Sequence, residues 1–189
     1  MLKKELRKLF REKRNALAAA EKAKLDDLLL IQFQTVDLPM LGTVFSYWPI
    51  EENKEPNTHL FTDFLEFRSP GLQLVYPRID STTGTMQGIL VDDDTRFTRN
   101  HFNVYEPEKG EVITTADIDL VLVPLLAFDK QGYRVGYGKG YYDKFLVGCR
   151  EDCIKAGFSH FEPVEAIDDC HDFDVPLDLC ITPQAVYVF

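Results

Sequence analysis

The residues best suited to chemistry lie in one segment, residues 123–143, which runs V-P-L-L-A-F-D-K-Q-G-Y-R-V-G-Y-G-K-G-Y-Y-D. It follows an apolar stretch, residues 120–123, that predicts a buried strand. Glycines after a strand let backbone N–H groups surround a phosphate, and a helix that begins just after them favours the anion through its dipole. Arg134 and Lys139 add positive charge, and Asp143 offers the oxygen ligand that Mg²⁺ prefers. The segment therefore predicts a loop that binds the phosphates of a nucleotide.

Glycines after a strand also occur in turns that bind nothing, and a lone G-x-G is weak evidence for a phosphate site. The loop is not a Walker A motif, because Gly140 rather than Ser or Thr follows Lys139. Its G-x-G-x-G spacing also differs from the Rossmann fingerprint. The density of glycines, with basic and aromatic residues between them, favours the phosphate interpretation.

The segment resembles the signature of the 5-formyltetrahydrofolate cyclo-ligase family, whose members are also called methenyltetrahydrofolate synthetases. That family has a proline after a strand, an apolar-Phe-Asp step, and then G-x-R-hydrophobic-G-x-G-x-G-Tyr-Tyr-Asp. The corresponding positions here are Pro124, Phe128-Asp129 and residues 132–143. The resemblance extends to a Lys/Arg-rich N-terminal helix, a Glu-x-x-Thr, a Tyr-Pro-Arg and an Asp-x-Pro-Leu-Asp. It therefore covers nearly the whole chain.

The resemblance implies an ATP- and Mg²⁺-dependent conversion of 5-formyltetrahydrofolate to 5,10-methenyltetrahydrofolate, with release of ADP and phosphate. Phosphorylation of the formyl oxygen turns it into a good leaving group, after which N10 of the folate closes on the formyl carbon. Mg²⁺ is the implied cofactor and ATP the co-substrate. This chemistry needs positioning and charge neutralisation rather than a Ser/His/Asp or Cys/His constellation.

The resemblance also implies roles for individual residues. The expected ATP-binding residues are Lys3, Lys4, Arg7, Arg134, Gly136, Tyr137, Gly138, Lys139, Gly140, Tyr141 and Tyr142. The expected folate-binding residues are Trp48, Glu55, Tyr137, Gly138, Lys139, Gly140 and Tyr141. The expected catalytic residues are Lys139, Arg134 and Tyr141, and the expected Mg²⁺ ligands are Asp143 and Asp174.

Three of these assignments have alternatives in the residues themselves. Glu55, in E-P-N-T, is expected to accept hydrogen bonds from pterin N–H groups, but a glutamate in a polar loop is more often solvated. Trp48 and its neighbour Tyr47 could form a wall for the pterin or could be core aromatics. The family has His before its C-terminal Asp, whereas Phe173 precedes Asp174 here.

A His-Asp pair does occur two residues earlier, so Asp172 is the alternative to Asp174. The distance from Asp174 to Thr182 fits the family pattern, which favours Asp174. Arg78 follows Tyr-Pro at a strand end, where the family's arginine faces the anionic ligands; a surface ion pair is the simpler interpretation.

Charge is unevenly distributed along the chain. The net charge is −10, which disfavours a nucleic-acid or anionic-membrane surface. Residues 1–14 hold seven cations and two acids, a local charge of +5, so the rest of the chain carries −15. A concentrated basic patch on an acidic protein favours one specific anionic ligand, and we expect small-molecule substrates as the partners.

Composition is that of an ordinary globular domain, with 45% hydrophobic and 28% charged residues. No apolar run approaches about 18 residues, and the N-terminus lacks an apolar signal region, so we expect a cytoplasmic protein without a membrane span. A monomer is expected. The four cysteines form no C-x-x-C motif; reduced thiols are expected, and a zinc site with His160 and His171 is the alternative.

Hydrophobic periodicity predicts alternating helices and strands over residues 1–189, as a single domain. We expect helices at residues 2–18, 21–35, 58–67 and 141–153. We expect strands at residues 43–49, 72–76, 85–91, 117–123, 154–158, 179–182 and 185–188. This order indicates an α/β, three-layer sandwich in which helices flank a mixed, largely parallel central sheet.

Two other functions fit part of the pattern. A phosphosugar isomerase-like enzyme could use the glycine loop, but it would leave the basic N-terminal helix unexplained. A non-catalytic nucleotide- or folate-binding module could use the whole pattern. Both Lys139 and Asp143 are present in the loop, which favours the enzyme.

Overall fold

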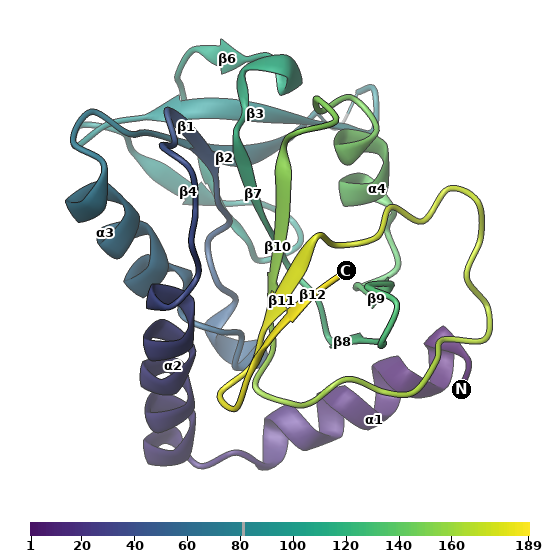
Figure 1. The fold of residues 1–189 in the computed structure, drawn as a ribbon. Helices are drawn as coiled ribbons and strands as arrows, with labels where there is room; N and C mark the ends of the chain where they lie inside the picture. Colours follow the sequence, from purple (N-terminus) through teal and green to yellow (C-terminus); the bar gives the residue numbers. More distant parts are fainter. Residues whose placement is uncertain (81) are drawn as a thin grey trace.

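The computed structural model describes residues 1–80 and 82–189. Eight strands form one sheet in the order β12-β11-β10-β7-β1-β2-β3-β6 (Figure 1). The five neighbouring parallel strands are β11 Leu179–Ile181, β10 Ile154–Phe158, β7 Leu120–Val123, β1 Thr43–Phe45 and β2 Gln73–Asp80. Antiparallel pairing adds β12 Val186–Val188, β3 Thr85–Val91 and β6 Val112–Ile113. The predicted mixed, mostly parallel sheet is therefore confirmed.

Strand β7 lies in the middle of the sheet, and its composition explains why. All four residues of Leu120–Val123 have no exposed surface. A strand that is apolar at every position can be buried only if both faces of the sheet are covered, as in parallel sheets. It pairs with β1 on one side and β10 on the other, and it leads directly into the glycine-rich segment.

Helices cover both faces of the sheet (Figure 1). On one face, α2 and α3 pack through aromatic side chains, with Phe61 stacked on Phe158 at 3.8 Å between ring centroids. On the other face, α4 packs Phe145 on Phe45 at 4.4 Å. The helices are α1 Lys3–Ala16, α2 Ala19–Gln34, α3 Thr58–Arg68 and α4 Tyr141–Leu146, with short 3₁₀ turns at Glu51–Asn53 and Thr115–Asp117.

Helix α1 lies across the base of the molecule (Figure 1). Its buried residues Leu6 and Phe10 share a hydrophobic cluster with Ala127 and Val135 of a small separate hairpin. That hairpin consists of β8 Ala127–Phe128 and β9 Arg134–Val135, and the glycine-rich loop follows it. Packing between α1 and the hairpin therefore places the basic face of α1 beside the glycines.

Three predicted helices match within two residues at each end, but the last one is shorter than predicted. Helix α4 ends at Leu146, not at residue 153. Gly148 follows the helix and is a poor helix former. Its carbonyl accepts a hydrogen bond from Thr115 Oγ1 at 2.6 Å, a contact from outside the helix that periodicity could not reveal.

Strand β2 is longer than predicted and passes through Pro77 to Asp80. Proline has no N–H to donate, so it is excluded from positions with a partner strand on both sides. The pairing with β1 stops at Val75, and Pro77 pairs only with Gly88 of β3. Strand β1 in turn ends at Phe45 instead of residue 49.

A second hairpin was not predicted. Strands β4 Phe97–Arg99 and β5 Tyr105–Pro107 form it. Its turn is stabilised by Asn100, whose side-chain oxygen accepts hydrogen bonds from the backbone of Phe102 and Val104. Asn103 adopts a φ of 64°, a left-handed conformation that asparagine tolerates. This turn determines where Phe102 lies.

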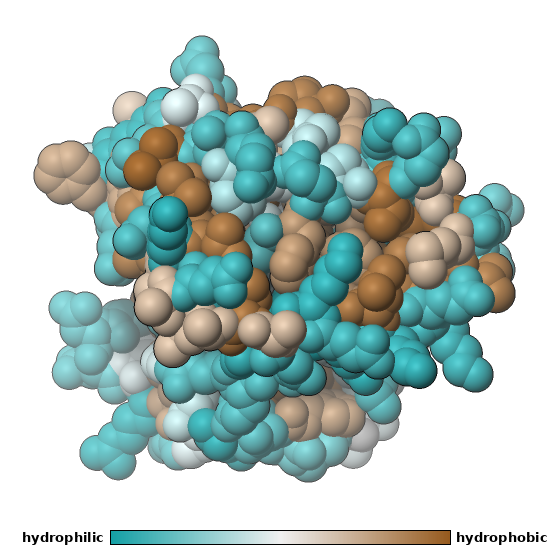
Figure 2. Space-filling model, turned by 90° about the horizontal axis from the view of Figure 1, so that it is seen from below, coloured by the Kyte–Doolittle hydropathy of each residue, from teal (hydrophilic) through white to brown (hydrophobic). Residues whose placement is uncertain are grey.

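The side of the molecule on which α1 lies is mostly hydrophilic, with separate hydrophobic patches between the polar side chains (Figure 2). In the part of the chain that the structure describes, every helix is too short or too polar to cross a membrane.

Candidate functional site

The glycine-rich loop, residues 136–140, connects β9 to α4 and requires glycine at two positions. Gly138 has a φ of 90° and Gly140 a φ of 71°, both in the left-handed region that residues with a Cβ rarely adopt. A Cβ on Gly138 would lie 3.3 Å from Cζ of Arg7. The absence of that carbon lets the guanidinium of Arg7 lie on the loop, where its Nε donates to the carbonyl of Gly136 at 2.9 Å.

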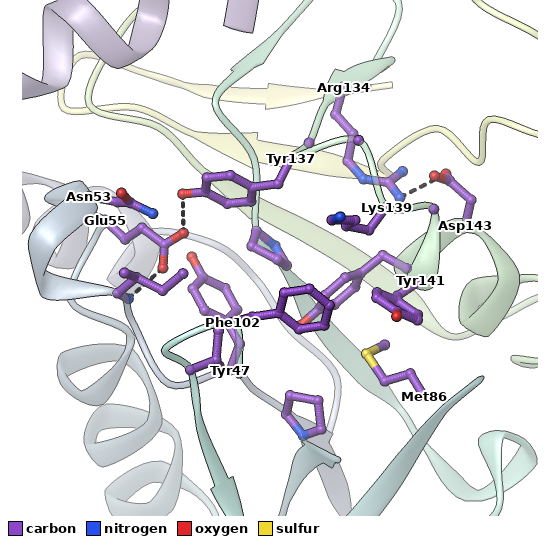
Figure 3. Close-up of a pocket in the computed structure, with 18 of the residues that line it drawn as sticks. Tyr47, Asn53, Glu55, Met86, Phe102, Arg134, Tyr137, Lys139, Tyr141 and Asp143 are labelled. Atoms are coloured by element: carbon purple, nitrogen blue, oxygen red, sulfur yellow. Dashed lines mark hydrogen bonds and ion pairs between the residues drawn. The ribbon is translucent and has the colours of Figure 1, made fainter. Parts of the chain in front are cut away.

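A cavity of about 370 Å³ opens between this loop, α1, the segment after β1, and β2–β3 (Figure 3). Fourteen of the fifteen site residues expected from the sequence line it. Lys4 does not: it is exposed on α1. The lining members of the expected set are Lys3, Arg7, Trp48, Glu55, Arg134, Gly136, Tyr137, Gly138, Lys139, Gly140, Tyr141, Tyr142, Asp143 and Asp174.

One end of the cavity holds a buried carboxylate. Glu55 is 3% exposed, so it is not the solvated loop residue that its local sequence favours. Its Oε2 accepts a hydrogen bond from the backbone N–H of Ile50 at 2.7 Å, and its Oε1 accepts one from the hydroxyl of Tyr137 (Figure 3). Burial raises the pKa of Glu55, while these hydrogen bonds and the positive charges of Arg14 and Lys22 oppose the rise.

Lys54 holds the loop that carries Glu55. Its backbone has a φ of 47° and ends the 3₁₀ turn Glu51–Asn53. Its ammonium donates to the carbonyls of Asn15 and Leu17 at 2.7 and 2.6 Å, at the C-terminal end of α1. Unpaired carbonyls at a helix end favour a cation. The loop is thereby attached to the same helix that supplies Lys3 and Arg7.

Aromatic side chains line the cavity between its two ends (Figure 3). Burial raises the pKa of the hydroxyls of Tyr137 and Tyr142, as does the negative charge of Glu55, so both stay neutral donors at physiological pH. Trp48 has a double role: it lines the cavity and also packs on Phe97 and His59, with ring centroids 4.8 and 4.7 Å away.

The opposite end of the cavity is cationic. Arg134 is 8% exposed, and its Nη2 donates to Oδ1 of Asp143 at 2.8 Å. Burial lowers the pKa of Arg134, although the charge of Asp143 opposes this. Lys139 is exposed, and its Nζ lies 5.3 Å from the ring centroid of Phe102. Lys139 forms no ion pair with any described residue, so its charge is available to a ligand.

The two expected Mg²⁺ ligands lie at this cationic end, but each is paired with a cation. Asp174 Oδ2 accepts hydrogen bonds from Lys3 Nζ at 2.5 Å and from the backbone N–H of His171 at 2.6 Å. Burial alone would raise the pKa of Asp174, but these two hydrogen bonds and the positive charge of Lys3 together outweigh it, and the pKa is lowered. Asp172, the alternative ligand, is exposed and does not line the cavity.

The carboxylates still fit a divalent cation that arrives with phosphate. Oδ2 of Asp143 and Oδ1 of Asp174 accept no hydrogen bond from the described residues. Among those residues, no group of three or more His, Cys, Asp or Glu side chains could hold a metal alone. Mg²⁺ is commonly bound by one or two carboxylates together with substrate phosphates and water, and two free carboxylate oxygens match that mode.

A model of the 5-formyltetrahydrofolate cyclo-ligase family matches residues 1–183 of the chain. The chain belongs to the 5-formyltetrahydrofolate cyclo-ligase family. A cyclo-ligase from Mycoplasma pneumoniae is 34% identical over 97% of this chain and 100% of its own length. Another from Mycoplasma genitalium is 30% identical over 94% of this chain and 97% of its own length.

Solved structures agree with this assignment. The NMR structure of a 5,10-methenyltetrahydrofolate synthetase from Aquifex aeolicus matches with a TM-score of 0.80 and 28% identity, covering 100% of this chain and 93% of that one. The structure of a 5,10-methenyltetrahydrofolate synthetase from Mycoplasma pneumoniae matches with a TM-score of 0.74 and 30% identity, covering 97% and 99% of the two chains. Family and relatives alike support cyclo-ligase activity: this chain is an enzyme of the ligase class in folate metabolism.

The cavity is also lined by residues that the sequence did not single out. Phe102, Val104 and Glu106 come from the β4–β5 hairpin, and Met86 comes from β3. The three hairpin residues were missed because the hairpin itself was not predicted, whereas Met86 lies in a predicted strand but carries no local signal of a binding site.

Arg78, which was expected to face the anionic ligands, is absent from the cavity lining; its Nη1 donates to the carbonyl of Glu108 at 3.3 Å. Its neighbours Pro77 and Ile79 do line the cavity. Arg78 therefore lies outside the candidate site.

Proposed function

We propose that this chain catalyses the ATP- and Mg²⁺-dependent closure of 5-formyltetrahydrofolate to 5,10-methenyltetrahydrofolate, with release of ADP and phosphate. One observation supports this above all: a single cavity has a cationic glycine loop at one end and a buried, hydrogen-bonded carboxylate among aromatic rings at the other (Figure 3). The first end suits a polyphosphate, and the second suits a planar ring that donates N–H groups. The two ligands would therefore meet in the middle.

The first step we propose is attack of the formyl oxygen on the γ-phosphorus of ATP. The O–P bond forms, the bond from the γ-phosphorus to the β–γ bridging oxygen breaks, and ADP leaves. Such transfers depend on alignment and on neutralising the three phosphoryl oxygens. Lys139 can reach the transferring group because nothing described holds its ammonium. Arg7 holds its guanidinium on the loop, and Arg134 holds its own against Asp143 at the start of α4. Tyr141 lies beside Lys139 (Figure 3).

In the second step, N10 of the folate bonds to the formyl carbon and gives up its proton. The carbon–oxygen bond to the phosphoryl group breaks, and inorganic phosphate leaves with the former formyl oxygen. The product has one carbon bridging N5 and N10. We propose that Glu55 orients the pterin for this closure by accepting its N–H groups, because a carboxylate with two donors already in place keeps two further lone pairs for a ligand.

Asp143 and Asp174 are the residues that would hold Mg²⁺, through the two oxygens that accept nothing from the described residues. The ion would supply positive charge to the phosphate oxygens. The ion pairs with Arg134 and Lys3 would keep both carboxylates in place.

The test is absorbance in the methenyltetrahydrofolate band when purified protein meets 5-formyltetrahydrofolate, with ATP and Mg²⁺ supplied together or omitted singly. We expect a rise only when both are present. Binding of folate and ATP without a rise would support a non-catalytic binder instead. A rise without ATP would contradict the phosphorylation step.

We further propose that the enzyme acts as a monomer in a reducing cytoplasm. The four cysteines, Cys149, Cys153, Cys170 and Cys180, are free thiols. All expected site residues that line the cavity come from one chain. Light scattering coupled to gel filtration should give the mass of one chain, 21.7 kDa, whereas twice that mass would indicate a dimer.

A further inference from the structure

One basic residue of helix α1, Arg14, points into the protein interior behind the cavity. Lys3, Arg7 and Arg11 line the cavity from successive turns of the helix. Arg14 comes next on this face, but it does not line the cavity and is only 1% exposed. A fully buried guanidinium is costly unless its charge and its donors are matched.

The donors of Arg14 are directed at the site. Nη1 donates to the hydroxyl oxygen of Tyr137 at 3.3 Å, and Nη2 donates to the carbonyl of Leu125. Its Nε has no partner among the described residues. Among the described residues, no carboxylate forms a salt bridge or hydrogen bond with Arg14; Glu55 accepts the hydrogen bond of Tyr137, on the far side of that hydroxyl.

Arginine sets the direction of the Tyr137 proton. A guanidinium can only donate hydrogen bonds, so the Tyr137 oxygen must accept from Arg14. The single hydroxyl proton of Tyr137 is then free to point at Glu55, where the structure shows the contact. The arrangement is a buried ion pair bridged by a hydroxyl, from Arg14 through Tyr137 to Glu55.

We propose that Arg14 is a positioning residue for the folate end of the cavity: it orients the Tyr137 hydroxyl and, through it, supports the ionised form of Glu55. This inference rests on the proposed function, because it assumes that Glu55 accepts hydrogen bonds from the folate.

The charges around Glu55 agree with that role. Titratable and charged groups face it from five parts of the fold: Arg14 on α1, Lys22 on α2, Tyr47 after β1, Tyr137 in the glycine loop and Tyr142 on α4. Burial raises the pKa of Glu55, and of these groups only Arg14 and Lys22 bring positive charge against that rise. Loss of Arg14 should therefore raise the pKa of Glu55 further.

The experiment compares wild type, Arg14→Met, Arg14→Lys and the control Lys13→Met by calorimetric binding of 5-formyltetrahydrofolate across a pH series, with turnover measured in parallel. Lys13 is exposed on the same helix and lies over Phe10, so its loss removes one α1 charge without touching the bridge. We expect Arg14→Met to weaken folate binding about 10-fold at neutral pH. We also expect it to move the acid-side loss of binding up by about one pH unit.

The Lys variant separates charge from geometry. It keeps the positive charge but cannot reach both Tyr137 and Leu125, so its acid-side transition should stay at the wild-type pH while its affinity falls. The Michaelis constant for ATP should be unchanged in both variants. In a Tyr137→Phe background, Arg14→Met should weaken folate binding less than it does in wild type, because the bridge is already lost and only the effect of the Arg14 charge on Glu55 remains.

Several outcomes would overturn the inference. A folded Arg14→Met protein with wild-type folate affinity and pH profile would show a purely structural role, as would additivity with Tyr137→Phe. If Arg14→Met does not fold, wild-type affinity in Arg14→Lys would overturn it equally. Failure of the proposed function looks different: wild type would then bind folate without producing methenyltetrahydrofolate, and the binding series would still decide the role of Arg14.

Discussion

Replacement of Asp143 by Asn should reduce both stability and Mg²⁺ affinity, and the structure allows the first effect to be estimated. Oδ1 of Asp143 accepts hydrogen bonds from Arg134 Nη2 at 2.8 Å and from the backbone N–H of Val175 at 3.2 Å. Asparagine keeps the accepting oxygen but removes the charge, and neutral hydrogen bonds are about half as strong as charge-assisted ones. Arg134, 8% exposed, would also lose its counter-ion.

Removing one partner of a fully buried ion pair costs about 3–5 kcal/mol. The side chain of Asp143 is 29% exposed, and Asp174 also faces Arg134, so solvent and a second carboxylate compensate in part. We therefore expect a loss of about 2 kcal/mol in the free energy of unfolding. For a chain of this length that lowers the melting temperature by about 4–8 °C.

The assay is thermal unfolding followed by circular dichroism, together with a Mg²⁺ titration of turnover at saturating ATP. We expect the Mg²⁺ concentration for half-maximal activity to rise about 10-fold or more, since changes around a metal commonly have that effect. Asp172→Asn is the matched control, because Asp172 is nearby, exposed and outside the cavity lining.

Wild-type melting and an unchanged Mg²⁺ titration in Asp143→Asn would refute the reasoning completely. A lower melting temperature with an unchanged Mg²⁺ titration would show that Asp143 is the ion-pair partner of Arg134 but not a Mg²⁺ ligand. A change in the Asp172→Asn titration would restore Asp172 as the second Mg²⁺ ligand.

Three further predictions concern other parts of the site. Lys139→Ala should lower kcat about 10²–10³-fold while the melting temperature stays unchanged, because Lys139 is exposed and, among the described residues, its ammonium lies only over the Phe102 ring. Lys144→Ala, an exposed change on α4, is the control, and normal kcat in Lys139→Ala would show that Lys139 takes no part in phosphoryl transfer. Folate binding should weaken as pH falls through the pKa of Glu55, which burial raises above its ordinary 4.5. Glu55→Gln should bind folate weakly and show no such pH transition. A transition that persists in this variant would belong to another titratable group. Gly138→Ala should raise the Michaelis constant for ATP and destabilise the fold by about 1–2 kcal/mol, because a residue with a Cβ is strained at a φ of 90°. A melting temperature equal to that of wild type would contradict this, because it would show that the loop changes conformation without cost.

The cationic end of the cavity, the proposed phosphate-binding end, could be predicted from sequence because its residues are neighbours in the chain. The glycines that need positive φ, the cation Lys139 and the carboxylate Asp143 all lie within residues 132–143, so their spacing alone defines a loop. The central strand could be predicted for the same reason, because four consecutive apolar residues, 120–123, have few alternatives to a fully buried strand.

The proposed folate-binding end depended on contacts between distant residues. Glu55 and Tyr137 are 82 positions apart, and nothing around either residue indicates that a polar-loop glutamate is buried against that hydroxyl. The cationic end depended on a distant contact as well: Lys3 and Asp174, 171 positions apart, form an ion pair only because α1 crosses the base of the sheet beside the chain that leads to β11. The same holds for Phe102, which reaches the cavity through an unpredicted hairpin.

The difference between what could and what could not be predicted from the sequence has a physical origin. Residue types and short-range spacing determine backbone conformation and the chemistry available, and these gave the family signature, the glycine loop and the α/β order of elements. Burial, charge pairing and pKa depend on which elements pack together. The isolation of Glu55 from water, the cations paired with Asp143 and Asp174, and the buried Arg14 were therefore decided only when the strands took their order and α1 closed the base of the cavity.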